Sequence, residues 1–386
     1  MARKLKKKVK IGLYILIAFL ILVIVLLCLK LNGSQEKEVV ETKEKVTTTI
    51  PTTTKPKDSN KLSMVLAGDC LIHRFVYTDA SNGDGTYSFS KMFTEIEDII
   101  KDKDIAYYNQ ESNIGGKALG LSAYPLFNSP EEIGDDMVKL GFNMVSLANN
   151  HTLDKGEKGV VNSVNFWKTK PGVYYSGQAL SWEERESNIK VLEKNGIKYA
   201  FFSYTTVTNG LNPPVGKEYL TNIYSEAKVK EDLAKVKDKV DFIIVAMHWG
   251  EEYTTYPSIG QKAIAQFLAK EGVNLVIGNH AHSIQPVEMI GDTLVFYALG
   301  NFISAQDTSD RLTGTIVTLN ANKTEEGKIV FTDVKADLIY TYFRGSSNFK
   351  IYPYTKLNNS LLYNYETYYN KYKSVLTRYT DIIEVK

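Results

Sequence analysis

Four of the five histidines in this chain lie in three short segments, and each segment follows a run of apolar, mostly β-branched residues. The segments are Asn149-Asn150-His151, His248-Trp249-Gly250 and Gly278-Asn279-His280-Ala281-His282. Imidazole is a common metal ligand in proteins, and parallel strands bring their carboxyl ends to one edge of a sheet. The placement therefore predicts a metal site on strand ends rather than four independent histidines.

Carboxylate and amide side chains occupy comparable positions. Asp69 follows the apolar run 61–67, and Glu111 follows the run 105–108. Together with the histidine segments, five predicted strand ends supply oxygen and imidazole donors. The donor set is Asp69, Glu111, Asn150, His151, His248, His280 and His282. Such a mixture suits one or two divalent ions of Mn, Zn or Fe and is poor for a soft-metal site.

Strands and helices alternate along the region that must position these donors. The apolar patterns predict strands at 61–67, 105–108, 142–147, 198–204, 241–247, 273–277 and 293–299, and helices at 89–101, 129–140, 159–168, 225–237 and 258–270. This order implies an α/β protein with a largely parallel sheet covered by helices. The donors would then meet at the carboxyl edge of the sheet, where such folds bind ligands.

The amino terminus has the composition of a membrane anchor. Basic residues concentrated in 1–10 precede an uncharged apolar run at 11–29, which at ~1.5 Å per residue nearly spans a hydrocarbon core of ~30 Å. A cleaved signal peptide is the alternative, but 23–31 contains no Ala-X-Ala sequence, and Leu27 disfavours lipid attachment at Cys28. We therefore expect a cytoplasmic segment 1–10, a transmembrane helix 11–31 and an extracellular remainder.

The residues after this run divide into a linker and a domain. Segment 32–60 is polar and rich in Glu, Lys, Thr and Pro, which predicts an extended extracellular linker, used either as a cell-wall spacer or merely tolerated. Residues 61–386 are expected to form one extracellular domain. Cys28 and Cys70 lie on either side of the linker, so no disulfide framework is expected. Basic residues past the anchor are balanced by acids, so we expect no nucleic-acid partner.

Six motifs occur in a characteristic order. They are Gly68-Asp69 with Arg74, Asn109–Glu111, Asn149–Gly156, His248–Tyr253, Gly278–Glu288 and Tyr297–Phe302. As a set they resemble the bacterial capsule-synthesis family CapA, also called PgsA, over a motif core of 62–304. That family is associated with poly-γ-glutamate production and is similar to the calcineurin-like metallophosphoesterases. The resemblance implies a four-layer α/β/β/α sandwich with a metal centre at one edge, here preceded by one transmembrane helix.

The resemblance also implies a role for each donor. Asp69 and His282 would hold one metal ion, Asn150, His248 and His280 the other, and Glu111 would bridge them. His151 would protonate the leaving group or stabilise the developing charge. Phosphoesterases begin with an Asp-X-His pair, whereas Asp69 is followed by Cys70 and Leu71. The first ion could therefore be weakly bound, absent, or completed by water or substrate, and His73 is an alternative ligand.

Further residues are candidates for substrate binding or for supporting the ligands. Asp154 and Glu252 could fix imidazole tautomers or cap loops. Arg74 could hold a substrate carboxylate or phosphate, or make a structural ion pair. Asn301 could reach the site or form a turn. The aromatic residues carry two interpretations as well, because Trp249, Tyr253 and the tyrosine-rich tail from residue 340 could serve packing or bind a polymer.

Two functions remain open from the sequence. The first is a membrane-anchored extracellular hydrolase or transferase that acts on an anionic cell-surface polymer or its precursor. Two divalent ions ~3.5–4 Å apart would activate a bridging water for attack on a phosphoester or an amide carbonyl. The second is a non-catalytic accessory subunit of a membrane polymer synthase or export complex. The missing Asp-X-His histidine, the anchor and the linker motivate this alternative, with synthase subunits as partners.

Overall fold

The computed structural model describes residues 59–386 of the chain. The predicted cytoplasmic segment 1–10, the transmembrane helix 11–31 and the linker as far as residue 58 lie outside the described residues. Among residues 59–386, no helix is both long and apolar enough to cross a membrane. The residues of the predicted domain 61–386 belong to one compact unit.

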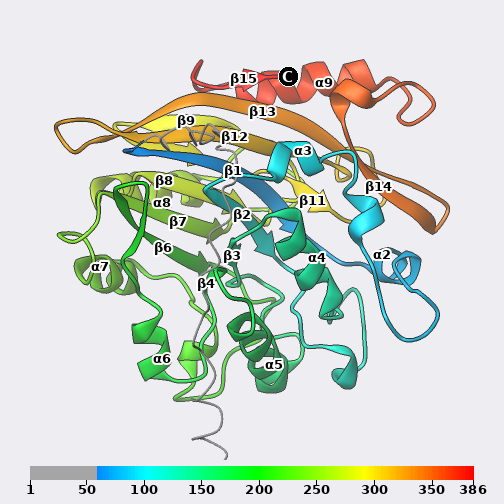
Figure 1. The fold of residues 1–386 in the computed structure, drawn as a ribbon, viewed down its shortest axis with the longest axis horizontal. Helices are drawn as coiled ribbons and strands as arrows, with labels where there is room; N and C mark the ends of the chain where they lie inside the picture. The colour runs from blue at the N-terminus through cyan, green and yellow to red at the C-terminus, as the bar shows by residue number, and fades with distance from the viewer. Residues whose placement is uncertain (1–58) are drawn as a thin grey trace, which may run out of the picture. The chain divides into compact units, whose positions relative to one another are not determined.

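Two mixed β-sheets form the centre of this unit (Figure 1). The first contains, in order, β14 (Ser347–Pro353), β13 (Ile329–Arg344), β12 (Thr313–Lys323), β1 (Lys61–Cys70), β2 (Ile105–Gln110), β3 (Met144–Ser146) and β4 (Tyr174–Ser176), with β11 (Asn301–Ile303) beside β1 and β15 (Glu384–Val385) beside β13. The second contains β5 (Leu192–Lys194), β6 (Ile197–Thr205), β7 (Phe242–His248), β8 (Leu275–Asn279), β10 (Thr293–Phe296) and β9 (Val287–Ile290). In both sheets the strands that carry the sequence motifs are parallel neighbours.

Strand β1 shows why the first sheet is buried on both faces. Leu62, Met64 and Leu66 pack into the core between the two sheets, whereas Val65 and Ala67 pack on the opposite side. Successive side chains of a strand point to opposite faces, so an uninterrupted apolar run produces a strand that is covered on both.

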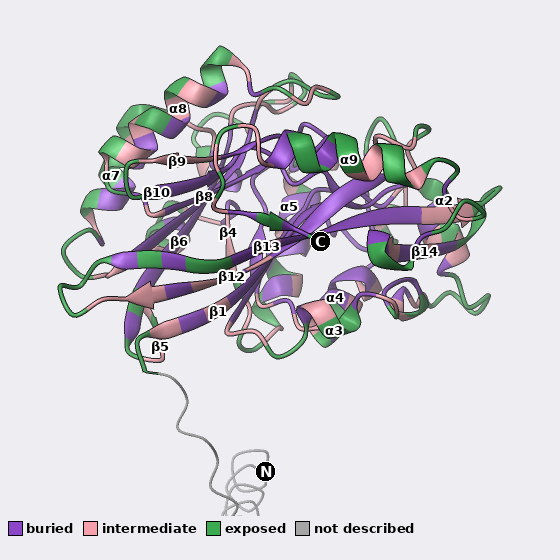
Figure 2. Cartoon of the chain, turned by 90° about the horizontal axis from the view of Figure 1, so that it is seen from above, coloured by how far each residue is buried: buried purple, intermediate pink, exposed green. Residues whose placement is uncertain are grey.

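Helices form the outer layers of the fold (Figures 1 and 2). The outer face of the first sheet packs against α2 (Arg74–Asp79), α3 (Glu97–Ile100), α4 (Glu132–Leu140) and α5 (Gly156–Lys168), and that of the second sheet packs against α7 (Glu226–Ala234) and α8 (Ile259–Lys270). The packing gives the layer order helix, sheet, sheet, helix. The predicted α/β class is confirmed.

Helix α8 shows how local signals fix an element beside the site. The Ser258 hydroxyl accepts a hydrogen bond from the Gln261 backbone N–H (3.2 Å), and the Gln261 side chain accepts one from the Ser258 N–H (2.9 Å). This capping box satisfies N–H groups that would otherwise lack partners at the helix start. The helix therefore begins directly after Ser258, as its sequence predicts.

The prediction of a largely parallel sheet is wrong, because both sheets are mixed. The pair β12–β13 and the pair β13–β14 are antiparallel, and β12 also runs antiparallel to β1. β9 and β5 add antiparallel edges to the second sheet. The parallel part is therefore restricted to the strands that carry the motifs, and the strands after residue 312 extend the first sheet.

The continuous helix predicted over 89–101 is also wrong. The segment forms a 3₁₀ turn at Ser90–Met92 and the short α3. The Asp136 carboxylate accepts hydrogen bonds from the backbone N–H groups of Phe89 (2.5 Å) and Ser90 (3.1 Å), which fixes the start of the segment against α4. The apolar spacing predicted the buried face of the segment but not its backbone conformation.

The tyrosine-rich tail contains α9 (Tyr365–Leu376), which packs beside the core between the sheets. Tyr372 is fully buried and donates to Asp310 Oδ1 (2.7 Å), and Tyr368 and Tyr369 are partly buried against the same core. Tyr363 is exposed. The inward tyrosines of this helix therefore serve packing.

Candidate metal centre

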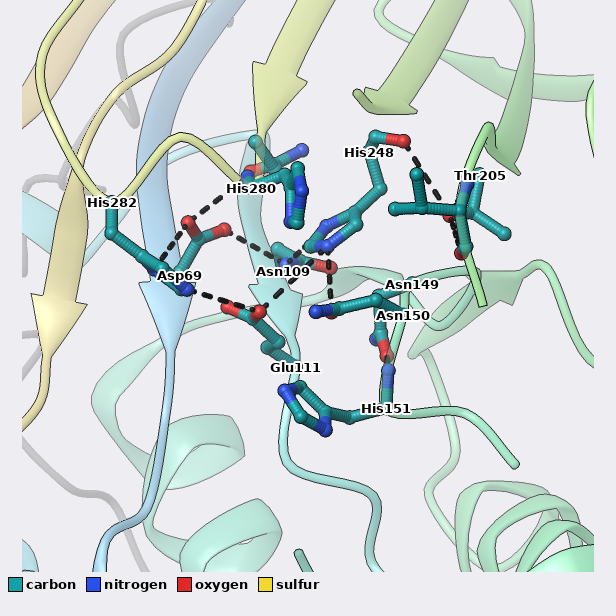
Figure 3. Close-up of polar contacts among 12 residues, drawn as sticks. Asp69, Asn109, Glu111, Asn149, Asn150, His151, Thr205, His248, His280 and His282 are labelled. Atoms are coloured by element: carbon teal, nitrogen blue, oxygen red, sulfur yellow. Dashed lines mark hydrogen bonds and ion pairs between the residues drawn. The ribbon is translucent and has the colours of Figure 1, made fainter. Parts of the chain in front are cut away.

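Carboxylates from the first sheet meet imidazoles from the second at the carboxyl ends of their parallel strands (Figure 3). Asp69 lies near the end of β1, Glu111 directly follows β2, and His248 ends β7. His280 and His282 follow β8. All five side chains are buried.

These side chains form two groups that could each hold a cation. Glu111, His248 and His280 make one group, and Asp69, Glu111 and His282 make the other. Within each group the candidate ligand atoms all lie within 4.8 Å of one another. Glu111 belongs to both groups, which is the arrangement of a carboxylate between two ions.

Glu111 provides the test of whether these residues fit a metal. The side chain is 0% exposed, and neither carboxylate oxygen has a hydrogen-bond partner among the described residues. Its Oε1 lies 3.5 Å from His282 Nε2 and 3.7 Å from His248 Nε2. Burial raises the pKa of Glu111 well above its usual range, opposed by the His282 charge. A carboxylate buried without donors is costly, and a divalent cation would satisfy it. The residues fit the metal.

The group around His248 is electrostatically prepared for a cation. His248 Nε2 lies within hydrogen-bond distance of Asn150 Oδ1 (2.9 Å), which brings these two candidate ligand atoms together. Burial, followed by the other histidines, lowers the pKa of His248 well below its usual range and that of His280 to about 4. Both imidazoles are therefore neutral near pH 7, as metal ligation requires.

The group around Asp69 is more strongly hydrogen-bonded. Asp69 accepts from Asn109 Nδ2 (2.8 Å) and from the His280 backbone N–H (3.1 Å). Its Oδ2 also lies 3.5 Å from His282 Nδ1. Burial alone would lower the pKa of His282, but the Glu111 and Asp69 carboxylates raise it to about 10. In the absence of metal, this imidazole is therefore protonated near pH 7.

Asn301 reaches the site and orients His282. Its Nδ2 donates to Gln306 Oε1 (2.8 Å) and to the Arg311 carbonyl (2.7 Å), so its Oδ1 is the acceptor that faces His282 Nδ1 at 2.9 Å. This contact assigns the proton of the neutral imidazole to Nδ1 and leaves Nε2 directed at Glu111.

His151 lies beside the two groups without joining either (Figure 3). Its Nδ1 is 2.7 Å from Asp154 Oδ2, which also accepts from the Phe127 backbone N–H (2.6 Å). The His151 ring packs edge-on against the Phe127 ring, with centroids 4.6 Å apart. Asp154 thus orients His151, and the imidazole Nε2 has no hydrogen-bond partner among the described residues.

Other predicted residues lie outside the two groups. The His73 ring is held by backbone groups, with Nδ1 3.2 Å from the Ala305 N–H and 3.1 Å from the Leu71 carbonyl. Arg74 is exposed and makes no ion pair or hydrogen bond with the described residues. Glu252 is also exposed, although its charge contributes to the raised pKa of His282. Trp249 is fully buried and its indole donates to the Tyr297 carbonyl (2.9 Å), a packing role.

Asn109 is a residue of the centre that sequence reasoning missed. Its Nδ2 bonds Asp69 and lies 3.4 Å from His248 Nδ1, so it joins the two groups. The sequence contains a pattern that could have identified it. Asn109 precedes Glu111 by two positions, and alternate residues of a strand share a face.

Two glycines of the motifs are required by close packing around the centre. A Cβ at Gly68 would lie 1.9 Å from the Gly300 carbonyl oxygen, and one at Gly278 would lie 1.9 Å from that of Tyr297. His280 and His282 have positive φ values of 90° and 48°, which are uncommon for residues with side chains. The loop that carries both imidazoles is therefore held in a strained, specific conformation by its surroundings.

The fold and the site define an α/β protein with a candidate two-cation centre between two sheets. Residues 63–306 match the family described as bacterial capsule synthesis protein PGA_cap, and the chain belongs to this family. The resemblance inferred from the six motifs is thereby confirmed.

Several known proteins are similar to this chain. The Capsule biosynthesis protein CapA of Bacillus anthracis is 26% identical over 267 residues, which cover 65% of this chain and 62% of that protein. The PGA biosynthesis protein CapA of Bacillus subtilis (strain 168) is 22% identical over 285 residues, which cover 71% of each. The chain thus spans less than two thirds of the B. anthracis relative.

Among solved structures, the NAD nucleotidase NadN of Haemophilus influenzae aligns with a TM-score of 0.45 at 13% identity, over 84% of this chain and 64% of that one. A hypothetical protein from Thermus thermophilus aligns with a TM-score of 0.42 at 14% identity, over 72% of this chain and 98% of that one.

Proposed function

We propose that this chain is a membrane-anchored extracellular protein of capsule or poly-γ-glutamate biosynthesis, with a metal-dependent hydrolase- or transferase-like site that acts on an anionic cell-surface polymer or its precursor. The family and the names of both Bacillus relatives support the process. The basic and apolar residues of 1–31 support the anchor. The observation that carries the chemical part is Glu111, a buried carboxylate without hydrogen-bond donors that is shared by two ligand groups.

The residues of such a site would have distinct roles in metal binding and proton transfer. Asp69 and His282 would hold one ion, Asn150, His248 and His280 the other, and Glu111 both. Bound divalent ions would lower the pKa of a water molecule and polarise a phosphoryl or carbonyl oxygen. His151 holds a proton on Nδ1 against Asp154, so its Nε2 is the atom that exchanges a proton with the leaving group. Phe127 excludes water from one edge of that imidazole.

The charge of the site favours an anionic substrate. Two divalent cations would outweigh the Asp69 and Glu111 carboxylates and leave the loaded centre positive. A chain of carboxylates or a phosphorylated precursor would be attracted to this field, whereas a neutral polymer would not.

Leu71 favours the alternative of a non-catalytic accessory subunit. It stands where the Asp-X-His pair of phosphoesterases has its imidazole, and its side chain is 2% exposed within the protein. His73 does not replace that imidazole, since it belongs to neither ligand group. The first ion would then have fewer protein ligands, and the domain could bind the polymer without cleaving it.

Metal analysis of the purified full-length chain tests the centre. We expect divalent metal in the wild type and a loss of at least one ion in His248→Ala and in His280→Ala. His73→Gln is the matched control, because it removes an imidazole outside both groups and should retain the metal. A wild type that holds no divalent ion after incubation with Mn or Zn would contradict the proposed centre.

Polymer production by cells separates the two functions. In cells that depend on this chain for polymer, His151→Ala should abolish production while the protein level and the metal content stay unchanged. Full production by that variant would favour the accessory subunit.

A further inference from the structure

Two arginines stack on tyrosines of the same loop, which we call the site loop (residues 249–257, between β7 and α8). The Arg311 guanidinium lies 3.7 Å from the centre of the Tyr253 ring. The Arg378 guanidinium lies 4.0 Å from the centre of the Tyr256 ring. Both contacts are cation–π stacks, but the two arginines donate hydrogen bonds to different kinds of partner.

Arg378 donates to the backbone of the site loop itself. Its Nη1 donates to the Thr255 carbonyl (2.8 Å), so it closes the site loop against the C-terminal segment. Arg311 donates through its side chain to Asp307 (2.8 Å), an exposed residue four positions earlier. A surface pair of this kind contributes little to stability and is easily exchanged for another anion. The N–H donors of Arg311 are therefore available to an anionic ligand.

Arg311 is also fixed in place next to the candidate metal centre. The Tyr253 ring also stacks with the His282 ring, with ring centroids 6.0 Å apart and an interplanar angle of 29°. The Tyr253 N–H donates to the Ala281 carbonyl (2.7 Å). The backbone of Arg311 is tied to the same histidine, because Asn301 bonds both the Arg311 carbonyl and His282.

We propose that Arg311 is a specificity-determining residue that binds an oxyanion of the substrate, a carboxylate or a phosphate, at the rim of the metal centre. The inference rests on the proposed function and names the substrate group that this site recognises. Stacking holds the flat face of the guanidinium on Tyr253 and keeps its N–H edge off the ring, where a substrate oxyanion that replaces Asp307 can make a bidentate contact. The Arg311 side chain is 30% exposed and Tyr253 is 44% exposed, so a substrate can reach this edge.

Calorimetric titration of the metal-loaded, detergent-solubilised full-length chain tests this role with two probes. One is a γ-linked glutamate hexamer, which offers carboxylates, and the other is inorganic phosphate. Arg311→Gln should weaken the binding of at least one probe by roughly 10- to 100-fold, the usual range for a lost charge-assisted pair. The probe that is weakened identifies the oxyanion. Arg311→Lys should lie between the wild type and Arg311→Gln, because lysine keeps the charge but not the fork.

Arg378→Gln is the matched control, since it breaks the same kind of stack on the same loop. It should keep the wild-type affinity for both probes. The proposal is overturned if Arg311→Gln and Arg311→Lys bind as the wild type does, or if Arg378→Gln weakens binding equally, because the loss would then reflect loop order.

Metal content, measured on each sample, keeps two failures apart. If the wild type and the Arg311 variants all hold full metal and bind each probe with equal affinity, the role of Arg311 alone is overturned. A wild type that holds no metal and binds neither probe would overturn both this role and the proposed function.

Discussion

At the scale of single residues, the proposed function assigns metal ligation and proton transfer to different side chains. The acids and imidazoles of the two ligand groups leave His151 outside, where Asp154 and Phe127 fix its ring. Asp154 was predicted to fix a tautomer or cap a loop, and its carboxylate contacts both the His151 ring and the Phe127 backbone N–H. In the proposed function this carboxylate would act through the imidazole, as a positioning residue.

Replacing Asp154 tests this arrangement. Asp154→Ala removes the acceptor for His151 Nδ1, so polymer production should fall by about 10²- to 10⁴-fold, the usual contribution of a positioned acid or base. Metal content should stay unchanged because Asp154 belongs to neither ligand group. The readout is polymer per cell. Production at the wild-type level by Asp154→Ala would show that Asp154 does not act through His151.

At the scale of secondary-structure elements, local apolar patterns predicted strands and helices near the motifs. They missed strands that are defined by pairing with distant segments of the chain. The strand ends that deliver Asp69, His248 and His280 follow apolar runs, and a capping box marks the start of α8. Strands β12 to β14 were not predicted, because they carry no motif and are defined by their pairing with β1 and with one another. Asn301 could not be assigned for the same reason: its partner His282 is brought near only by the folded loops.

The junction between β1 and α2 provides a pH test. Burial lowers the pKa of His73 to about 4, below the 6.5 of an unperturbed imidazole. The Ala305 backbone N–H can only donate, so the His73 Nδ1 accepts from it, and a proton on Nδ1 would break this contact. Between pH 6.5 and about 4 the unfolded chain binds a proton that the folded chain does not. The free energy of unfolding should therefore decrease as pH falls through this window, by at most about 3 kcal/mol from this group.

Urea denaturation of the wild type and His73→Gln measures this contribution by difference, which removes the groups that titrate in both proteins. The advantage of the wild type should be full above pH 6.5 and should shrink toward pH 4. Two curves that stay parallel across this window would show that His73 is not buried as a neutral ring.

At the scale of the whole described unit, the centre is a product of how the two sheets are packed. The acids come from the first sheet and the metal-ligand imidazoles from the second, so neither sheet contains a ligand group alone. Polar contacts also join the sheets. They are Asn109 Nδ2 to His248 Nδ1 (3.4 Å), Asn279 Nδ2 to the Tyr107 hydroxyl (2.8 Å) and Ser146 Oγ to Ser203 Oγ (2.7 Å). Any change that separates the sheets should therefore dismantle both groups together.

Truncation after Gln306 tests this dependence, because the family match ends there while every predicted donor is retained. The shortened chain loses β12, whose residues Ile316 to Asn322 pair with β1, and loses the apolar side chains of β12, β13 and α9 that fill the core between the sheets. β1 would become an exposed edge beside an open core, so the chain should be insoluble or unfolded by circular dichroism and should hold no metal. A chain that ends at Arg378 is the control: β15 is the one strand that it loses, together with the buried side chains of Ile383 and Val385, and it should fold with a lower melting temperature and full metal content. A folded, metal-binding chain ending at Gln306 would mean that the motif core supports the centre alone.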